Sequence, residues 1–175
     1  YSHSGSPTDP AEPNDVTAQN NAGLTSSATS FDVTPDSTSP TGQSISAPAY
    51  ATTTSVAFTT ADGSDTGSGL DTSTRLIRRA ESALSNDTCD PFGSPSGSFT
   101  SPDTTVTSGH CYLYELTIAD KVGNVSTPVT VTVKVDTSAP AAPSLSYGSF
   151  SNAVLSGGVV FYRPSAAAGQ FAVTP

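Results

Sequence analysis

The chain has 175 residues, with 14 glycines, 14 prolines, two cysteines, no methionine or tryptophan, and only 12% charged residues. Its formal net charge of −9 at pH 7 argues against nucleic acid and anionic membranes as partners. No apolar run is long enough to span a bilayer, which predicts no membrane insertion by this segment. A composition so poor in charge and aromatic residues can accompany disorder, but regular alternation of apolar and polar residues favours threonine-rich strands.

Two segments of the chain, 16–40 and 116–140, resemble each other at a spacing of one hundred residues without a gap. The matched positions are Thr17 and Thr117, Gly23 and Gly123, Ser26 and Ser126, Val33 and Val133, Asp36 and Asp136, and Pro40 and Pro140. A period of this length is the size of a small domain, so the repeat predicts a tandem array of domains.

In chain order, residues 1–35 are expected to be the last strands of a preceding domain. Residues 36–136 form a complete domain, and residues 137–175 are the first strands of a following one. Neither end has enough strands to bury a core by itself. We therefore expect both ends to pair with something beyond the segment, either neighbouring domains of a longer chain or other copies of the protein.

Strands are predicted where apolar and polar residues alternate. The clearest case is the run from Val129 to Val135, in which valines alternate with threonine or lysine. The expected strands are 16–18, 29–33, 44–46, 54–60, 74–79, 104–107, 112–118, 129–135, 144–147, 158–163 and 170–174, with loops at 61–71 and 86–102. The stretch from Arg75 to Leu84 also has helical spacing, and strand is the preferred interpretation.

The two cysteines, Cys89 and Cys111, both fall in the central segment. In a lysine-poor β chain they predict a disulfide formed in an oxidising compartment, with a pair of free thiols as the alternative. A zinc site is not expected, because two cysteines and two scattered histidines, His3 and His110, do not make a ligand set.

The turn Asp120-x-x-Gly123-Asn124 and the later Val-Asp-Thr-x-Ala-Pro joint at 135–140 carry a family resemblance. Together with the Ser-Gly loop at 67–70, they resemble bacterial immunoglobulin-like (Big-type) repeats, which build stalks of secreted adhesins and other giant surface proteins. The resemblance implies an all-β fold of tandem immunoglobulin-like β-sandwiches, one complete and two partial, at an extracellular or cell-surface location. The N-terminal copy departs from the pattern at Asn20 and Leu24, which replace the turn Asp and Asn.

Oxygen-bearing side chains at the turn and the joints could bind calcium and stiffen the array. The candidates are Asp36, Asp120, Asn124 and Asp136. The alternative is that they serve as turn and strand-end residues, where Asp and Asn form bonds with the backbone. The joint aspartate is the stronger candidate because it is present in both copies, as Asp36 and Asp136.

Other candidate site residues have equally plain alternatives. Arg75, Arg78 and Arg79 could pair with acidic surface of a neighbouring copy, or line a solvated strand face. Asn86 and Asn124 begin glycosylation sequons, which also arise by chance. Lys134 resembles crosslinking lysines of surface proteins, but no partner is evident.

Catalysis is not expected, since the chain has no paired carboxylates, phosphate-binding loop or nucleophile elbow, and Ser108-Gly109-His110 is no triad by itself. We expect a structural module of an extracellular stalk or filament, with no cofactor except the calcium considered above. The alternative is an adhesin or carbohydrate-binding module acting through loops 61–71 and 86–109, where Phe92 and Phe99 would supply an aromatic platform. An appendage domain of a secreted enzyme is a third possibility.

Overall fold

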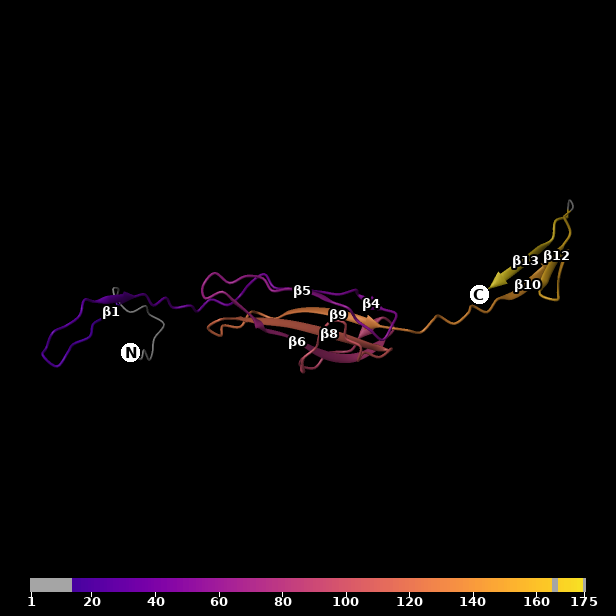
Figure 1. Ribbon diagram of the computed structural model, residues 1–175. Coiled ribbons are helices and arrows are strands. Elements are labelled where there is room, and N and C mark those ends of the chain that lie inside the picture. Colours follow the sequence, from indigo (N-terminus) through magenta and orange to yellow (C-terminus); the bar gives the residue numbers. More distant parts are fainter. Residues whose placement is uncertain (1–13, 165–166, 175) are drawn as a thin grey trace. The chain divides into compact units, whose positions relative to one another are not determined.

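The computed structural model describes residues 14–164 and 167–174 (Figure 1). The chain divides into two compact units, and the boundary in the sequence lies between Thr137 and Ser138. Every regular element in the described ranges is a β-strand. The first unit holds β1 (Asn14–Val16), β2 (Thr29–Phe31), β3 (Ser44–Ser46), β4 (Tyr50–Ala51), β5 (Thr59–Ala61), β6 (Leu70–Ser85), β7 (Thr88–Cys89), β8 (His110–Asp120) and β9 (Val129–Val135). The second holds β10 (Ser146–Ser151), β11 (Ala153–Ser156), β12 (Val159–Tyr162) and β13 (Gln170–Thr174).

Residues 36–137 fold as a sandwich of two sheets. The larger sheet has the strand order β4-β9-β8-β6-β7, in which β4 runs parallel to β9, and the smaller sheet pairs β3 with β5. Valine and aromatic side chains that alternate along β8 and β9 point into the space between the sheets. The buried core comprises Val56, Phe58, Ile77, Val106, Tyr112, Tyr114, Leu116, Val133 and Val135. The predicted alternation along these two strands is therefore confirmed.

Strand β6 settles the ambiguous stretch from Arg75 to Leu84 in favour of a strand. It pairs antiparallel with β8 from Leu76 opposite Thr117 to Ala83 opposite His110. The helical spacing of this stretch is a weak local preference, whereas the pairing with β8 supplies a full ladder of backbone hydrogen bonds. The strand is also longer than predicted, since it begins at Leu70.

The predicted edge strand at 104–107 is wrong. The backbone N–H of Thr105 donates to Asp103 Oδ1 (2.9 Å), and that of Thr107 donates to the Tyr112 hydroxyl (2.8 Å). Side chains thus take the backbone donors that a neighbouring strand would have used. The strand expected at 54–60 is likewise shorter, because only β5 and an isolated bridge from Val56 to Asp103 form there.

The N-terminal hairpin, defined as residues 14–31, reproduces the β8–β9 hairpin at the hundred-residue spacing. Val16 pairs with Thr29 as Leu116 pairs with Val129. The turn matches as well: Ser26 N donates to Ala18 O (2.7 Å), and Ser126 N donates to Ile118 O (2.8 Å). Gly23 and Gly123 both adopt positive φ, of 83° and 98°, a conformation that glycine adopts without strain. The repeat seen in sequence is thus a repeat of register and turn geometry.

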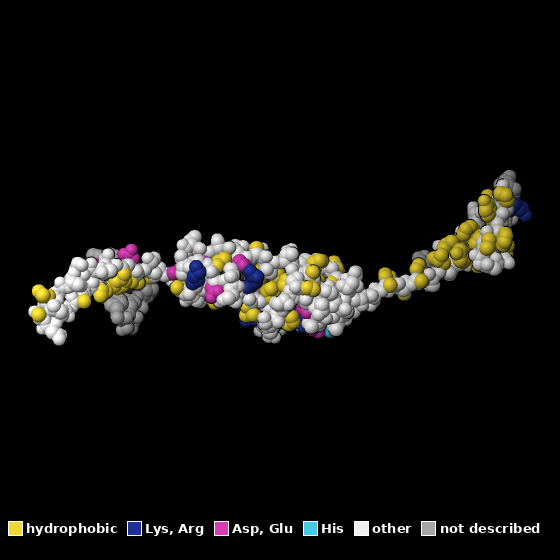
Figure 2. Space-filling view, viewed as in Figure 1, with side chains coloured by type: hydrophobic (Ala, Val, Ile, Leu, Met, Phe, Trp, Pro, Cys, Tyr) yellow, Lys and Arg dark blue, Asp and Glu magenta, His cyan; other side chains and the backbone are white. Residues whose placement is uncertain are grey.

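The second unit consists of two antiparallel pairs, β10 with β13 and β11 with β12. Many of its apolar side chains are exposed, and Figure 2 shows them as hydrophobic surface over these strands. They are Leu145, Tyr147, Phe150, Val154, Leu155, Val159, Phe161, Tyr162, Phe171 and Val173.

Candidate functional site

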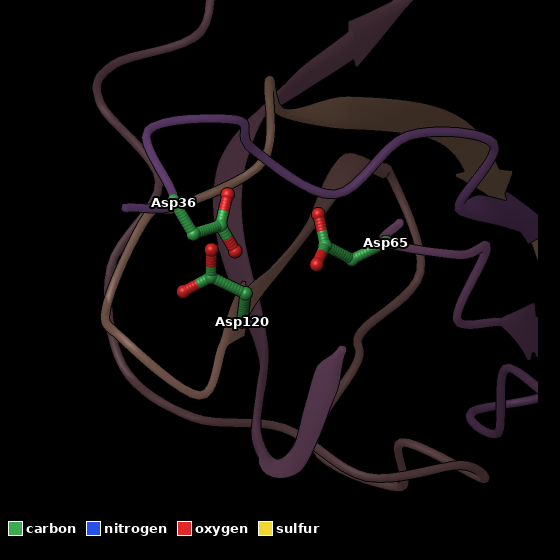
Figure 3. A group of neighbouring side chains, drawn as sticks. All are labelled: Asp36, Asp65 and Asp120. Carbon is green, nitrogen blue, oxygen red and sulfur yellow. The ribbon is translucent and has the colours of Figure 1, made fainter. Parts of the chain in front are cut away.

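Three aspartates converge where the chain enters the sandwich. Asp36 precedes β3, Asp65 lies in the loop between β5 and β6, and Asp120 ends β8. One carboxylate oxygen from each lies within 4.8 Å of the other two. Figure 3 shows Asp36 and Asp120 with their carboxylates close together and Asp65 facing them.

Asp36 is fixed by two separate segments. Its Oδ2 accepts a hydrogen bond from Ser68 N (2.6 Å), and its Oδ1 accepts from Thr38 N (3.0 Å) and Thr38 Oγ1 (2.8 Å). These donors, the Ser68 N–H first among them, hold the pKa of the Asp36 carboxyl well below its usual range. The carboxylate therefore ties the incoming linker to the β5–β6 loop.

Asp120 caps the turn that follows β8. Its Oδ1 accepts from the backbone N–H groups of Val122 (3.0 Å), Gly123 (2.7 Å) and Asn124 (2.8 Å). Burial alone would raise the pKa of Asp120, but these bonds and one from the Asn124 side chain outweigh it and lower the pKa. Asp65 plays the same part in its own loop, where Oδ2 accepts from Gly67 N (3.0 Å) and Gly69 N (2.9 Å).

Asn124 joins the turn to the linker. Its Nδ2 donates both to Asp120 Oδ2 (2.7 Å) and to the backbone carbonyl of Asp36 (3.2 Å). Three carboxylates are the kind of hard oxygen ligand that calcium takes. Their backbone hydrogen bonds also account for the cluster as three capped turns, so calcium binding stays a prediction.

The structure brings together three of the four predicted calcium ligands. Asp136 lies elsewhere, at the far end of β9, where its backbone N–H donates to Ala51 O (3.0 Å). Sequence reasoning missed Asp65. The signal that could have found it is the Asp-x-Gly-x-Gly spacing, because an aspartate there can cap the two following glycine N–H groups.

The three candidate interaction arginines each pair with an acid of the same sandwich. Arg75 binds Asp62 through two hydrogen bonds, Arg78 contacts Glu115 (2.9 Å), and Arg79 contacts Asp103 (2.6 Å). Only the last pair is largely buried, since the side chains of Arg79 and Asp103 are 13% and 2% exposed.

Asp103 is the centre of a buried polar network. Its Oδ2 accepts from Arg79 Nη1 and from the Tyr114 hydroxyl (2.9 Å), and its Oδ1 accepts from Thr105 N (2.9 Å) and Oγ1 (2.7 Å). Burial would raise the pKa of Asp103, yet these donors together lower it. Burial first and the bond to Asp103 second raise the pKa of the Tyr114 hydroxyl.

The two loop aromatics are half-buried. Phe99 packs against the core, and the Arg79 guanidinium lies over its ring at 4.4 Å from the centroid. Phe92 is also only partly exposed. These positions differ from the open aromatic platform on which a sugar ring would stack.

The predicted disulfide is confirmed, since Cys89 and Cys111 are bonded and join β7 to β8. Such a bond indicates an oxidising, non-cytoplasmic environment. Of the two sequon asparagines, Asn86 is exposed at the β6–β7 turn, while the amide of Asn124 is engaged as described above.

The remaining sequence candidates that the structure describes, Lys134 and His110, are partly exposed. Lys134 Nζ donates to Asp87 O (2.6 Å) and Oδ1 (3.0 Å). His110 lies 3.4 Å from a carboxylate oxygen of Glu81, and His3 lies outside the described residues.

Comparison of the chain with protein-family models, with curated proteins and with solved structures finds no match. Within residues 14–164 and 167–174, the structure holds no helix of the length and apolar character needed to cross a membrane.

Proposed function

We propose that this protein is a structural repeat module of an extracellular stalk or filament, built from tandem immunoglobulin-like domains. The observation that carries the proposal is that the chain enters and leaves the central sandwich at opposite ends. At the entrance, Asp36 is bonded to Ser68 and Asn124, beside the end of β8. At the exit, Thr137 N donates to Ser108 Oγ (2.9 Å), beside the start of β8.

The distance between these two ends is set by β8. This strand has 11 residues, so ten steps of about 3.4 Å separate its first residue from its last and give a length of roughly 34 Å. Figure 1 shows the chain passing into the sandwich on one side and out on the other. Domains joined in this way extend an array along the strands, which is the arrangement that a spacer needs.

The pairing of β4, near the entrance of the chain, with β9, the last strand, suits the sandwich to bearing tension. Strand β4 runs parallel to β9, and Lys134 N donates to Ala49 O (2.9 Å) while Asp136 N donates to Ala51 O (3.0 Å). Tension applied through the two ends of the sandwich pulls these parallel strands past each other. The hydrogen bonds between them are then loaded together in shear, instead of being opened one after another.

Two further observations support the proposal. The N-terminal hairpin repeats the end of the sandwich bond by bond, and it leads into the joint at Asp36 as β9 leads into Asp136. The turn and joint residues also resemble those of bacterial immunoglobulin-like repeats. The half-buried positions of Phe92 and Phe99 favour this structural role over the carbohydrate-binding alternative.

A pulling experiment on the full chain, held by handles at its two ends, tests the proposal. Proline at position 136 removes the N–H that bonds Ala51, whereas alanine keeps it, so Asp136→Pro and Asp136→Ala form a matched pair. We expect one abrupt rupture for the unmodified chain and for Asp136→Ala, and rupture at a clearly lower force for Asp136→Pro. Unfolding without an abrupt rupture, or equal forces for the pair, would contradict a load-bearing role for the β4–β9 contact.

A further inference from the structure

We propose that the turn between β6 and β7 is a strap that holds β4 against β9 and so determines how long the sandwich withstands tension. The strap is defined as residues 86–89. The disulfide of Cys89 fixes it to the central strand β8, and Asp87 binds side chains of both β4 and β9. The inference rests on the proposed function, because it names the side chains that reinforce the load-bearing contact.

A row of paired residues across the larger sheet shows where the strap lies. Tyr50 of β4 pairs with Lys134 of β9. Lys134 also pairs with Cys111 of β8, which pairs in turn with Ser82 of β6. Paired residues point to the same face of a sheet, and successive residues of one strand point to opposite faces. Because Tyr112 belongs to the core, this row lies on the outer face of the sheet.

Two members of the row are covered although they face away from the core. Cys111 is completely buried and Ser82 is 9% exposed. Cys111 is bonded to Cys89, the last residue of β7. The strap therefore bends over the outer face of the sheet and lies along the row.

Further along the row, Asp87 binds two neighbouring strands with one carboxylate. The Tyr50 hydroxyl donates to Asp87 Oδ1 (2.9 Å), and Lys134 Nζ donates to the same oxygen (3.0 Å) and to Asp87 O (2.6 Å). Lys134 Nζ also lies 5.2 Å from the centroid of the Tyr50 ring. The bonds from Lys134 first and from Tyr50 second lower the pKa of the Asp87 carboxyl, so the carboxylate keeps its charge at neutral pH.

The local sequence explains why Asp87 is available for these bonds. Asn86 and Asp87 have positive φ, of 48° and 62°, in a two-residue turn between Ser85 and Thr88. Asn and Asp adopt this left-handed conformation more readily than other residues that carry a Cβ. The tight turn keeps Asp87 within two residues of the disulfide, which limits how far its carboxylate can move.

The strap strengthens a contact that is short, since β4 consists of Tyr50 and Ala51. When tension slides β4 along β9, Tyr50 moves away from Asp87, which Lys134 and the disulfide hold in place. The bond from Tyr50 then breaks together with the backbone bonds between the two strands. Native contacts that are lost in the transition state slow unfolding.

A constant-load experiment on the full chain, held by handles at its two ends, tests the strap. Lys134→Met removes the donor to Asp87 and keeps the backbone of β9, whereas Tyr50→Phe removes the hydroxyl and keeps the ring. The matched control is Arg75→Met, which removes an ion pair with Asp62 that is also open to solvent but lies outside the strap. We expect lifetimes under load that are several-fold shorter in Lys134→Met and Tyr50→Phe and unchanged in Arg75→Met.

Urea unfolding of the same variants separates this role from ordinary stability. Polar contacts open to solvent contribute little to the free energy of unfolding, so all three variants should lose similarly little. A lifetime of Lys134→Met equal to that of Arg75→Met would overturn the strap, and so would a shorter lifetime matched by a correspondingly larger loss in urea. If Asp136→Pro weakens the sandwich and Lys134→Met does not, the strap is wrong and the proposed function stands.

Reduction tests the part played by the disulfide. Without the bond between Cys89 and Cys111 the strap is no longer fixed to β8, so the reduced chain should unfold sooner under the same load. Tyr50→Phe should then shorten the lifetime by a much smaller factor than in the oxidised chain, because coupled changes are not additive. An equal factor in both states would overturn the role assigned to the disulfide.

Discussion

Two ion pairs of the sandwich, Arg79–Asp103 and Arg75–Asp62, differ in burial and therefore in their expected contribution to stability. Arg79 is largely buried between Asp103 and the rings of Phe99 and Tyr112, whereas Arg75 binds Asp62 near the surface, with 40% of its side chain exposed. A buried carboxylate that loses its partner keeps the full cost of desolvation. An exposed pair gains little, because water already solvates both charges.

We expect Arg79→Met to lower the free energy of unfolding by about 3–5 kcal/mol, because Asp103 stays buried without its cationic partner. The matched variant Arg75→Met should lower it by less than about 1 kcal/mol. Urea unfolding followed by circular dichroism measures both. Equal losses in the two variants would show that burial of the Asp103 network is not what stabilises the sandwich.

The aspartates predict how stability depends on pH. The pKa values of Asp36, Asp103 and Asp120 are all lowered in the folded chain. A carboxyl group with a lowered folded pKa contributes stability that is complete above its unfolded pKa of about 4 and is lost as the pH falls below it. We therefore expect the free energy of unfolding to be level from pH 7 to about 5 and to fall steadily at lower pH.

The variant Asp120→Asn isolates one of these groups. It removes the titration at this position while an amide oxygen can still accept the backbone N–H groups, as Asn20 does in the N-terminal turn. The loss of stability between pH 5 and pH 2 should be smaller in this variant than in the unmodified chain. Identical pH profiles would mean that Asp120 does not titrate in this range.

At the scale of secondary-structure elements, the local sequence determines some strands of the sandwich but not others. The strands β8 and β9 could be predicted because each has one buried face, and a buried face places apolar residues at every second position of the sequence. The secondary structure of the β6 segment was harder to predict, because the spacing of its apolar residues fits a helix as well as a strand. These residues are Leu76, Ile77, Ala80 and Leu84. The prediction of a strand at 104–107 was wrong because backbone N–H groups of this segment donate to the side-chain oxygens of Asp103 and Tyr112 and not to a neighbouring strand.

The candidate site could be predicted only in part, for a related reason. Asp36, Asp120 and Asn124 stand in the repeated turn and joint, where sequence comparison within the chain draws attention to them. Asp65 lies in an unrepeated loop, and its approach to Asp120 depends on how the β5–β6 loop folds against the end of β8. Contacts of this kind come from tertiary structure and leave no local pattern.

The disulfide ties the short edge strand β7 to the central strand β8. The two cysteines are 22 residues apart, so the bond closes a loop of that length in the unfolded chain. Replacing both by alanine should lower the free energy of unfolding by about 3 kcal/mol, through the entropy that the unfolded chain regains. Chemical denaturation of the double variant measures this loss, and an unchanged midpoint would contradict it.

At the scale of the whole molecule, the same bond limits how far the sandwich can lengthen under tension. Unfolding with the disulfide intact leaves the segment between Cys89 and Cys111 closed. Reduction frees these 22 residues and should add about 70 Å to the extension gained when the sandwich unfolds, given about 3.5 Å per residue less the original span. Pulling traces recorded with and without reductant measure the difference, and equal extensions would mean that the bond is absent.

The opposite placement of entrance and exit has a consequence for how such a protein evolves. In the proposed array, each complete domain would advance the chain by about 34 Å before the joint to the next domain. In such an array, a complete domain has its own core and its chain leaves at the end opposite to the entrance, so duplicating one domain would lengthen the array by this distance and leave the contacts within the other domains unchanged. The length of the proposed array would therefore be set by the number of domains alone.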